Sequence, residues 1–166
     1  MSKLIKDGVI DNDSWTLLKE STGPEVLEAI PNRNLIVPLG FWQENQAELA
    51  DYNGAIGVWL PSALDAEEVD IDWDLFPVIA LDFPIFSDGR SYSNARLIRQ
   101  NLNFKGELRA IGDILRDQLY YLSQCGFNAF ALRHDQDPDG CVLALNDFAT
   151  SYQATVSEPV PLYRRR

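Results

Sequence analysis

Cysteine and histidine are scarce in this chain of 166 residues. Cys125 and Cys141 form no CxxC pair and have no zinc-type spacing, and His134 is the single histidine. A transition-metal centre, a disulfide framework and a Ser-His-Asp triad with a GxSxG elbow are therefore not indicated. We expect Cys125, at the end of a helical pattern, to be a buried thiol, which fits a reducing, cytoplasmic compartment.

Basic residues and long apolar runs are also in short supply. Fourteen Lys and Arg residues stand against 25 Asp and Glu residues, which gives a formal net charge of −11. Nucleic acids and anionic membranes bind clustered cationic side chains, so neither is expected as a partner. No stretch approaches the roughly 20 apolar residues that a membrane span needs, and the N-terminus lacks the apolar run of a secretory signal.

Cofactor and metal fingerprints are missing as well. The chain contains no GxGxxG, no GxxxxGK[ST] and no flavin motif. The sequence therefore does not indicate a redox cofactor, and the cofactor stays unknown. Residues 135–140, DQDPDG, match the opening of an EF-hand loop, but Asn146 stands where the bidentate Glu is required. We expect a solvated acidic turn there rather than a calcium site.

What the chain does contain is the composition of one globular domain over residues 1–166. Hydrophobic residues make up 46% and charged residues 23%, with four Trp, six Tyr and eight Phe to fill a core. Asp7-Gly8 predicts a hairpin turn within residues 4–18, and residues 19–33 are a polar connection. Residues 155–166 are expected to form a flexible tail.

Apolar segments with the pattern of buried strands alternate with helical patterns. The predicted strands cover residues 35–39, 55–61, 76–84, 106–112 and 128–133. The predicted helices run from Trp42 to Tyr52, from a cap at Ser91 or Ser93 to Asn101 or Asn103, from a cap at Asp113 to Cys125, and over about residues 140–154 with Leu143, Phe148 and Tyr152 inward. Residues 64–77 can hold a short helix.

This alternation predicts an α/β fold with a five-stranded, mostly parallel sheet flanked by helices, beside the small N-terminal hairpin. An open doubly wound sheet and an incomplete β/α barrel fit the pattern equally well. The strand order and the oligomeric state stay open.

Charged side chains follow the third predicted strand. The loop from Asp82 to Arg90 is long for a β–α connection and ends at a helix N-terminus, where free N–H groups favour an anion. Arg90 and Arg96 could add charge-assisted hydrogen bonds to such an anion. The alternative is a simple Asp-Gly turn in which Arg90 pairs with Asp82 or Asp88. Both interpretations remain open.

A second charged cluster follows the fourth predicted strand and comprises Asp113, Arg116 and Asp117, with Arg133 at the end of the fifth. The two clusters meet if the strands are parallel neighbours. A carboxylate between arginines stays ionised, which suits electrostatic binding better than general-base catalysis. Alternatively, Asp113 only caps a helix and Asp117 pairs with Arg116 or Arg133. Arg109 can point to the other face of the sheet.

Two segments resemble a known bacterial family. They are LDFPIFSDGRSYSNARLIRQ at 81–100 and GELRAIGDILRDQLYYLSQCGFNAFAL at 106–132, and the IKDG opening and FATSYQ ending also fit. The pattern is similar to that of domain-of-unknown-function family 934, whose members are often described as oxidoreductases of sulfite reduction. That description looks like an inference from gene neighbourhood. The family usually reads DGRGYS, whereas Ser91 replaces the glycine here.

The resemblance implies a role in sulfur assimilation and brings no established catalytic residues. Together with the charged clusters, it leads us to expect a cytoplasmic accessory protein or oxidoreductase of assimilatory sulfite reduction. Such a protein would bind a small anion or a partner, such as sulfite reductase or another sulfur-assimilation enzyme. A lyase- or isomerase-type enzyme at the same site and a non-catalytic interaction module for sulfite reductase are the alternatives. The candidate ligand-binding residues are Asp82, Asp88, Arg90, Arg96, Asp113, Arg116, Asp117 and Arg133.

Overall fold

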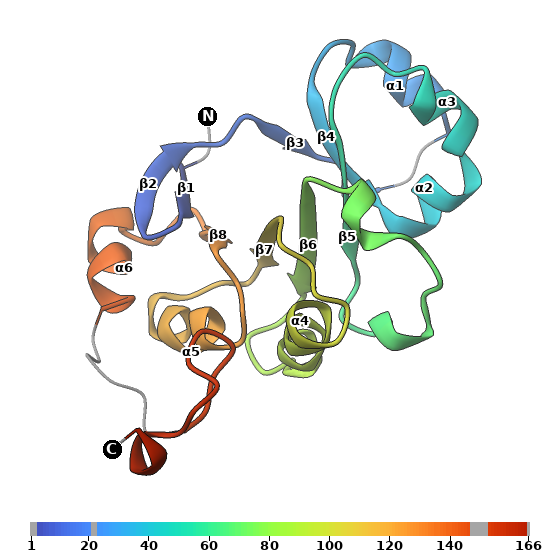
Figure 1. Cartoon of the computed structure of the whole chain (residues 1–166). Coiled ribbons are helices and arrows are strands. Elements are labelled where there is room, and N and C mark those ends of the chain that lie inside the picture. The colour runs from blue at the N-terminus through green and yellow to red at the C-terminus, as the bar shows by residue number, and fades with distance from the viewer. Residues whose placement is uncertain (1–2, 21–22, 147–152, 166) are drawn as a thin grey trace.

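Eight strands form a single sheet in the computed structural model, which describes residues 3–20, 23–146 and 153–165 (Figure 1). The strand order is β2 (Val9–Asn12), β1 (Lys3–Lys6), β8 (Ala129–Ala131), β7 (Glu107–Gly112), β6 (Val78–Phe83), β5 (Ile56–Leu60), β4 (Asn34–Pro38) and β3 (Trp15–Leu17). β1 is antiparallel to both of its neighbours, and every other pair is parallel. The sheet curls into a half-barrel.

The five predicted strands are confirmed as β4 to β8, but the predicted number of strands is wrong. Three N-terminal strands extend the sheet to eight. From β3 to β8 the strands lie side by side in sequence order, without the reversal that defines a doubly wound sheet. Of the two predicted architectures, the incomplete barrel is therefore the one that forms.

The predicted N-terminal hairpin is confirmed. β1 and β2 pair antiparallel, with Lys6 opposite Val9 across the Asp7-Gly8 turn. Asp7 has φ 49° and Gly8 has φ 79°, as a two-residue hairpin turn with two left-handed positions requires. The same stretch of sequence also holds β3, which pairs in parallel with β4 and was not predicted.

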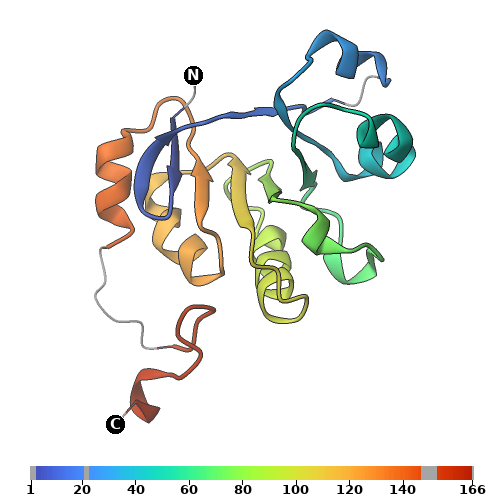
Figure 2. The same ribbon diagram turned by 45° about the horizontal axis from the view of Figure 1, so that its top comes forward.

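The two edge strands of the sheet are consecutive in the sequence. β2 ends at Asn12 and β3 begins at Trp15, so only Asp13 and Ser14 separate them. Because consecutive Cα atoms are about 3.8 Å apart, the two edges come within about 11 Å of each other here. Residues 9–17 form an extended segment, which we call the N-terminal strap, across the open side of the half-barrel (Figures 1 and 2).

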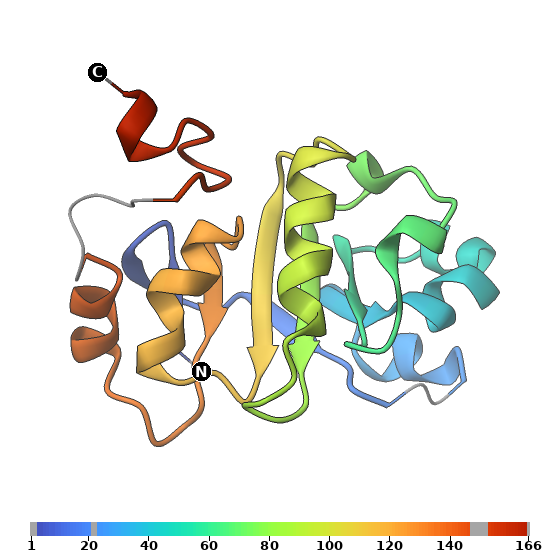
Figure 3. The same cartoon turned by 90° about the horizontal axis from the view of Figure 1, so that it is seen from below.

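Six α-helices and four 3-10 turns complete the described part of the chain. Figure 3 shows α4 and α5 side by side over one face of the sheet. The helices are α1 (Glu25–Ala29), α2 (Leu39–Glu44), α3 (Gln46–Ala50), α4 (Arg90–Gln100), α5 (Leu119–Gln124) and α6 (Pro138–Ala144). The 3-10 turns are η1 (Ala66–Glu68), η2 (Trp73–Leu75), η3 (Arg116–Gln118) and η4 (Leu162–Arg164).

Two early helices differ from the prediction. The helix expected from Trp42 to Tyr52 is two short helices, α2 and α3, that meet at Asn45. Asn45 has φ −124° and its side-chain amide donates to the Phe41 carbonyl at 2.9 Å, so it competes with the helical backbone. The polar connection at 19–33 contains α1, which was not predicted.

The predicted caps and the last helix also need correction. Gly89 rather than a serine precedes α4, and Asp113 lies before the turn that opens at Leu115. The last helix starts earlier than predicted, because Asp137 accepts the Gly140 N–H and Pro138 occupies the first turn. Leu143 was expected inward but is exposed. Phe148 and Tyr152 lie outside the described residues.

The two faces of the sheet have different interiors. Alternate residues such as Ile79, Leu81 and Leu108 face the helices and join the main apolar core, in which Cys125 is buried as expected. The opposite, concave face carries a small apolar cluster of Ile36, Val78, Ala80 and Ile111. Glu107 and Arg109 share that concave face, because they stand in register with Val78 and Ala80.

A buried ion network occupies the concave face and contains Arg109, which is 2% exposed. Its Nε donates to Glu107 Oε1 at 2.7 Å, and its Nη1 donates to Asp13 Oδ2 at 2.9 Å. Lys6 Nζ lies 2.8 Å from the other oxygen of Glu107. Because Asp13 lies at the middle of the N-terminal strap, this network fastens the strap to a central strand.

Replacing Arg109 with Met should lower the free energy of unfolding by about 3–5 kcal/mol, because Asp13 and Glu107 would lose their shared buried cation. Urea unfolding of the full chain measures the difference. Arg33→Met, at an exposed position, is the matched control and should change stability by less than about 0.5 kcal/mol. An unchanged unfolding midpoint for Arg109→Met would contradict this account of the network.

Candidate functional site

The loop between β6 and α4 is fixed at its far end by Asp88. The Asp88 carboxylate, 8% exposed, accepts the Ser62 hydroxyl at 2.6 Å and Arg90 Nη2 at 2.7 Å. Arg90 Nε also donates to Asp88 at 3.0 Å. The hydrogen bonds from Arg90 and Ser62 hold the pKa of Asp88 well below its usual range. The predicted alternative pairing of Arg90 with Asp88 is therefore confirmed.

The near end of the same loop is fixed by Asp113, which follows β7. Because β6 and β7 are parallel neighbours, Phe83 lies opposite Gly112, and the Asp113 N–H donates to the Phe83 carbonyl at 2.7 Å. The Asp113 carboxylate accepts the Phe86 N–H at 3.1 Å and Arg133 Nη1 at 2.8 Å. Asp113 thus joins the ends of three strands instead of capping the next helix.

Arg133, after β8, completes a second paired cluster. It donates to Asp113 and, through Nε and Nη2, to both oxygens of Asp135 at 2.7 Å each. These contacts raise the pKa of Arg133 above its ordinary value. Asp113 and Asp135 therefore bind the Arg133 guanidinium from two sides. Arg133 and Arg90 are thus both paired with carboxylates.

Two large apolar side chains stand exposed between these clusters. Ile85 is 59% exposed and Phe86 is 51% exposed, at the tip of the loop. The Asp88 N–H donates to the Ile85 carbonyl at 3.0 Å, which closes a turn around the tip. With Asp113 holding the Phe86 backbone, the loop presents two apolar side chains to solvent on a fixed backbone. We call residues 84–90 and their two ion-pair clusters the carboxyl-edge surface.

Asp82 differs from the other carboxylates of this edge. It ends the concave face of β6, half buried, and among the described residues no arginine pairs with it. Burial raises its pKa, Asp88 raises it further, and Lys19 lowers it in part. Gly112, at φ 98°, leaves space for it, since a Cβ there would lie 2.7 Å from Asp82 Oδ1.

Three of the predicted site residues lie apart from this surface. Arg96, on α4, lies over the ring of Tyr121 with 5.8 Å between its Cζ and the ring centroid. Arg116 Nε donates to the Gly140 carbonyl at 3.0 Å, and Arg133 pairs with Asp113 and Asp135. The alternative that Asp117 pairs with Arg116 or Arg133 is therefore wrong. Asp117 is exposed on η3. The structure therefore brings together Asp82, Asp88, Arg90, Asp113 and Arg133.

A family comparison agrees with the resemblance in the sequence. The model of the family described as "Bacterial protein of unknown function (DUF934)" matches residues 57–163. The chain belongs to the DUF934 family. Searches among curated proteins and among solved structures gave no match.

The matched region of this DUF934 chain contains the carboxyl-edge surface. Ser91 is fully buried, and its hydroxyl donates to the Asp82 carbonyl at 2.7 Å. The serine thereby ties the start of α4 to the end of β6. It supports the backbone of the loop without contributing an exposed group.

Sequence reasoning missed Ser62 and Lys19. Ser62 is the first polar residue after β5, so the rule that pointed to Asp82 could have found it. Lys19 follows β3, which the sequence did not predict as a strand. Its approach to Asp82 depends on the half-barrel bringing the strap near β6, and no local pattern encodes that.

The described part of the chain was searched for metal-binding clusters and for membrane-spanning helices. Over residues 3–20, 23–146 and 153–165, no group of three or more His, Cys, Asp or Glu side chains could hold a metal ion. In the acidic turn, Asp135 pairs with Arg133 and Asp137 caps α6. Among the same residues no helix is long and apolar enough to cross a membrane.

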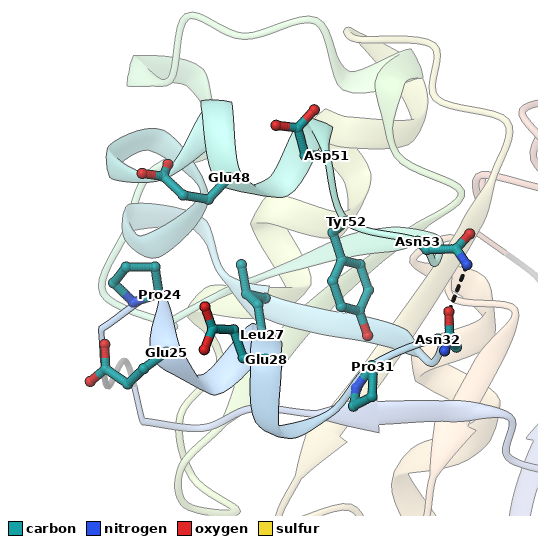
Figure 4. A pocket seen from close by; sticks show the side chains of 10 residues that line it. All are labelled: Pro24, Glu25, Leu27, Glu28, Pro31, Asn32, Glu48, Asp51, Tyr52 and Asn53. Atoms are coloured by element: carbon teal, nitrogen blue, oxygen red, sulfur yellow. Dashed lines mark hydrogen bonds between the residues drawn. The ribbon is translucent and has the colours of Figure 1, made fainter.

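A cleft with a volume of about 610 Å³ lies away from this edge, between α1 and α3 (Figure 4). It is lined by Pro24, Glu25, Leu27, Glu28, Pro31, Asn32, Glu48, Asp51, Tyr52 and Asn53. These residues precede β4 and β5, so the cleft lies at the amino ends of the strands and outside the region matched by the family.

Asp82→Asn should remove an unfavourable buried charge at neutral pH. Because the folded pKa of Asp82 is raised, its ionisation costs stability as pH rises above the unfolded value of about 3.9. The variant should be more stable than the parent chain at pH 7, and the advantage should vanish at acid pH, where Asp82 is protonated. Thermal unfolding across pH 3–7 tests this, with exposed Asp70→Asn as a control; an advantage independent of pH would contradict it.

Proposed function

We propose that this chain is a cytoplasmic accessory protein of assimilatory sulfite reduction that binds a partner protein through its carboxyl-edge surface. The observation that carries the proposal is the exposure of Ile85 and Phe86, on a hydrogen-bonded loop, between two ion-pair clusters. Exposed apolar side chains with a polar rim are typical of protein interfaces.

Of the two expected ligands, a small anion fits this surface less well than a partner protein. Arg90 donates to Asp88 through two nitrogens, and Arg133 donates to Asp113 and Asp135. The positive charge of each guanidinium is already balanced by a carboxylate partner, and the surrounding net charge of −11 would oppose the approach of an anion. A protein partner does not depend on these charges, because it can contact the exposed apolar tip.

The backbone order of the loop favours binding. A backbone that is already held by hydrogen bonds loses little conformational entropy when a partner covers it, so more of the buried apolar area appears as affinity. Phe86 has the size of a typical interface hot spot. The hydrogen bond that Ser62 donates to Asp88 and the one that Asp113 accepts from the Phe86 N–H would therefore support binding without touching the partner.

The place in metabolism rests on the family resemblance. It supports sulfite reductase, or another sulfur-assimilation enzyme, as the proposed partner. Deleting the gene and supplying sulfate, sulfite or sulfide as sole sulfur source tests the pathway. We expect growth to be restored by sulfide alone, which would place the step at sulfite reduction, whereas normal growth on sulfate would remove this assignment.

The surface itself is tested by capturing sulfite reductase with the purified chain. Phe86→Ser and Ile85→Ser should each weaken capture by about five- to thirtyfold, since each removes about one or two kcal/mol of apolar contact. Leu75→Ser is the matched control, because Leu75 is 61% exposed at the amino end of β6. Equal loss in all three variants, or no capture by the parent chain, would count against a specific docking surface.

A second candidate function is an enzyme acting on a small molecule, and Asp82 is the observation that favours it. Perturbed carboxylates at strand ends are common in active sites. A lyase or isomerase would use this Asp as a proton acceptor, with Lys19 to balance charge. Complementation of the deletion by Asp82→Asn separates the two functions: full growth supports docking alone, and lost growth with intact capture of the partner supports chemistry.

A further inference from the structure

The cleft between α1 and α3 has an apolar floor. Leu27 and the ring of Tyr52 lie at its centre, with Pro24 and Pro31 beside them (Figure 4). The Tyr52 hydroxyl lies 2.5 Å from the Ile30 carbonyl oxygen and accepts the Arg33 N–H at 3.2 Å. The polar end of this ring is thus satisfied within the fold, and its apolar face remains for a ligand.

The rim of the cleft carries charge of one sign. Glu25 and Glu28 come from α1, and Glu48 and Asp51 from α3 and its C-terminal end (Figure 4). In the part of the chain that the structure describes, no Lys or Arg belongs to the lining. An apolar floor under four carboxylates fits a segment that combines apolar side chains with a cation.

The end of the same chain has the complementary chemistry. In η4, Leu162 and Tyr163 are exposed, and the Arg164 guanidinium lies 5.6 Å from the centroid of the Tyr163 ring. Arg165, whose Nη1 lies 2.6 Å from Glu158 Oε2, and Arg166 follow in the sequence. In a chain of net charge −11, the three consecutive arginines at 164–166 are the most concentrated positive segment of the sequence, and Arg164 lies beside an aromatic ring.

The two surfaces cannot meet within one molecule. The C-terminal segment attaches near the end of α5, where the Val156 N–H donates to the Gln124 carbonyl at 3.1 Å. Figures 1 and 2 show η4 and α1 on opposite sides of the fold. We propose that η4 of one molecule, led by Leu162, Tyr163 and Arg164, docks in the cleft between α1 and α3 of a second copy.

Such a contact joins two different surfaces and is therefore heterologous. The charge of the rest of the molecule opposes association, so the local attraction must overcome a general repulsion. Self-association should therefore be weak, dependent on concentration and sensitive to the charges of the cleft and of η4. It is also independent of the carboxyl-edge surface, since the cleft lies at the other end of the strands.

Sedimentation velocity of the full chain over a concentration series tests this proposal. We expect the parent chain to self-associate at about 0.15 M salt, where the Debye length is about 8 Å. Glu28→Lys with Glu48→Lys should weaken association by at least about tenfold, and so should Arg164→Glu alone. A strictly monomeric parent chain would overturn the proposal and leave the cleft to a different partner.

Mixing the variants makes the test specific. The cleft variant and the Arg164→Glu variant should each be monomeric, because like charges then face each other across the contact. Their mixture should form a heterodimer, because the unchanged η4 of the cleft variant meets the unchanged cleft of the Arg164→Glu variant. Glu67→Lys with Glu68→Lys is the matched control and should associate like the parent chain, as should Phe86→Ser. Thermal unfolding verifies that each variant is folded. Association that survives both reversals, or a mixture that stays monomeric, would refute the contact.

Discussion

The buried cation of Arg109 is the interaction on which the arrangement of the sheet depends. Placing this guanidinium in the concave face costs several kcal/mol of desolvation, which only close and well-oriented carboxylates can offset. Glu107 comes from the same strand, but Asp13 comes from the N-terminal strap, 96 residues away in sequence. The pair therefore fixes the strap over the open side, and the strap joins the two edges of the half-barrel.

With the strap across the open side, the two ion-pair clusters of the carboxyl-edge surface lie at the carboxyl ends of the strands. The parallel register of β6 and β7 places Phe83 opposite Gly112, so the loop after one strand meets the first residue after the other. Asp113 can then hold the Phe86 backbone and Arg133 together. Asp88, Asp113 and Arg133 thus use their charges in ion pairs that fix loops. Asp82 has no arginine partner among the described residues, and burial raises its pKa.

Local patterns predicted the five central strands because each is a short apolar run between turn residues. They failed where contacts between distant residues decide the structure. Asp113 follows a strand and looks like a helix cap, but Arg133, 20 residues later, is the stronger partner. The helix after Phe41 breaks because one side chain, Asn45, competes for its backbone. β3 is only three residues long, and its pairing with β4 is a contact between distant residues that no local pattern shows.

The two proposed surfaces lie at opposite ends of the parallel strands, and this separation has a functional consequence. The carboxyl-edge surface falls within residues 57–163, which the family shares, whereas the cleft precedes β4 and β5 and lies outside that match. A partner held at Phe86 would therefore leave the cleft open to a second copy. Self-association could then bring several bound partners together, because linked binding sites raise the effective concentration of each.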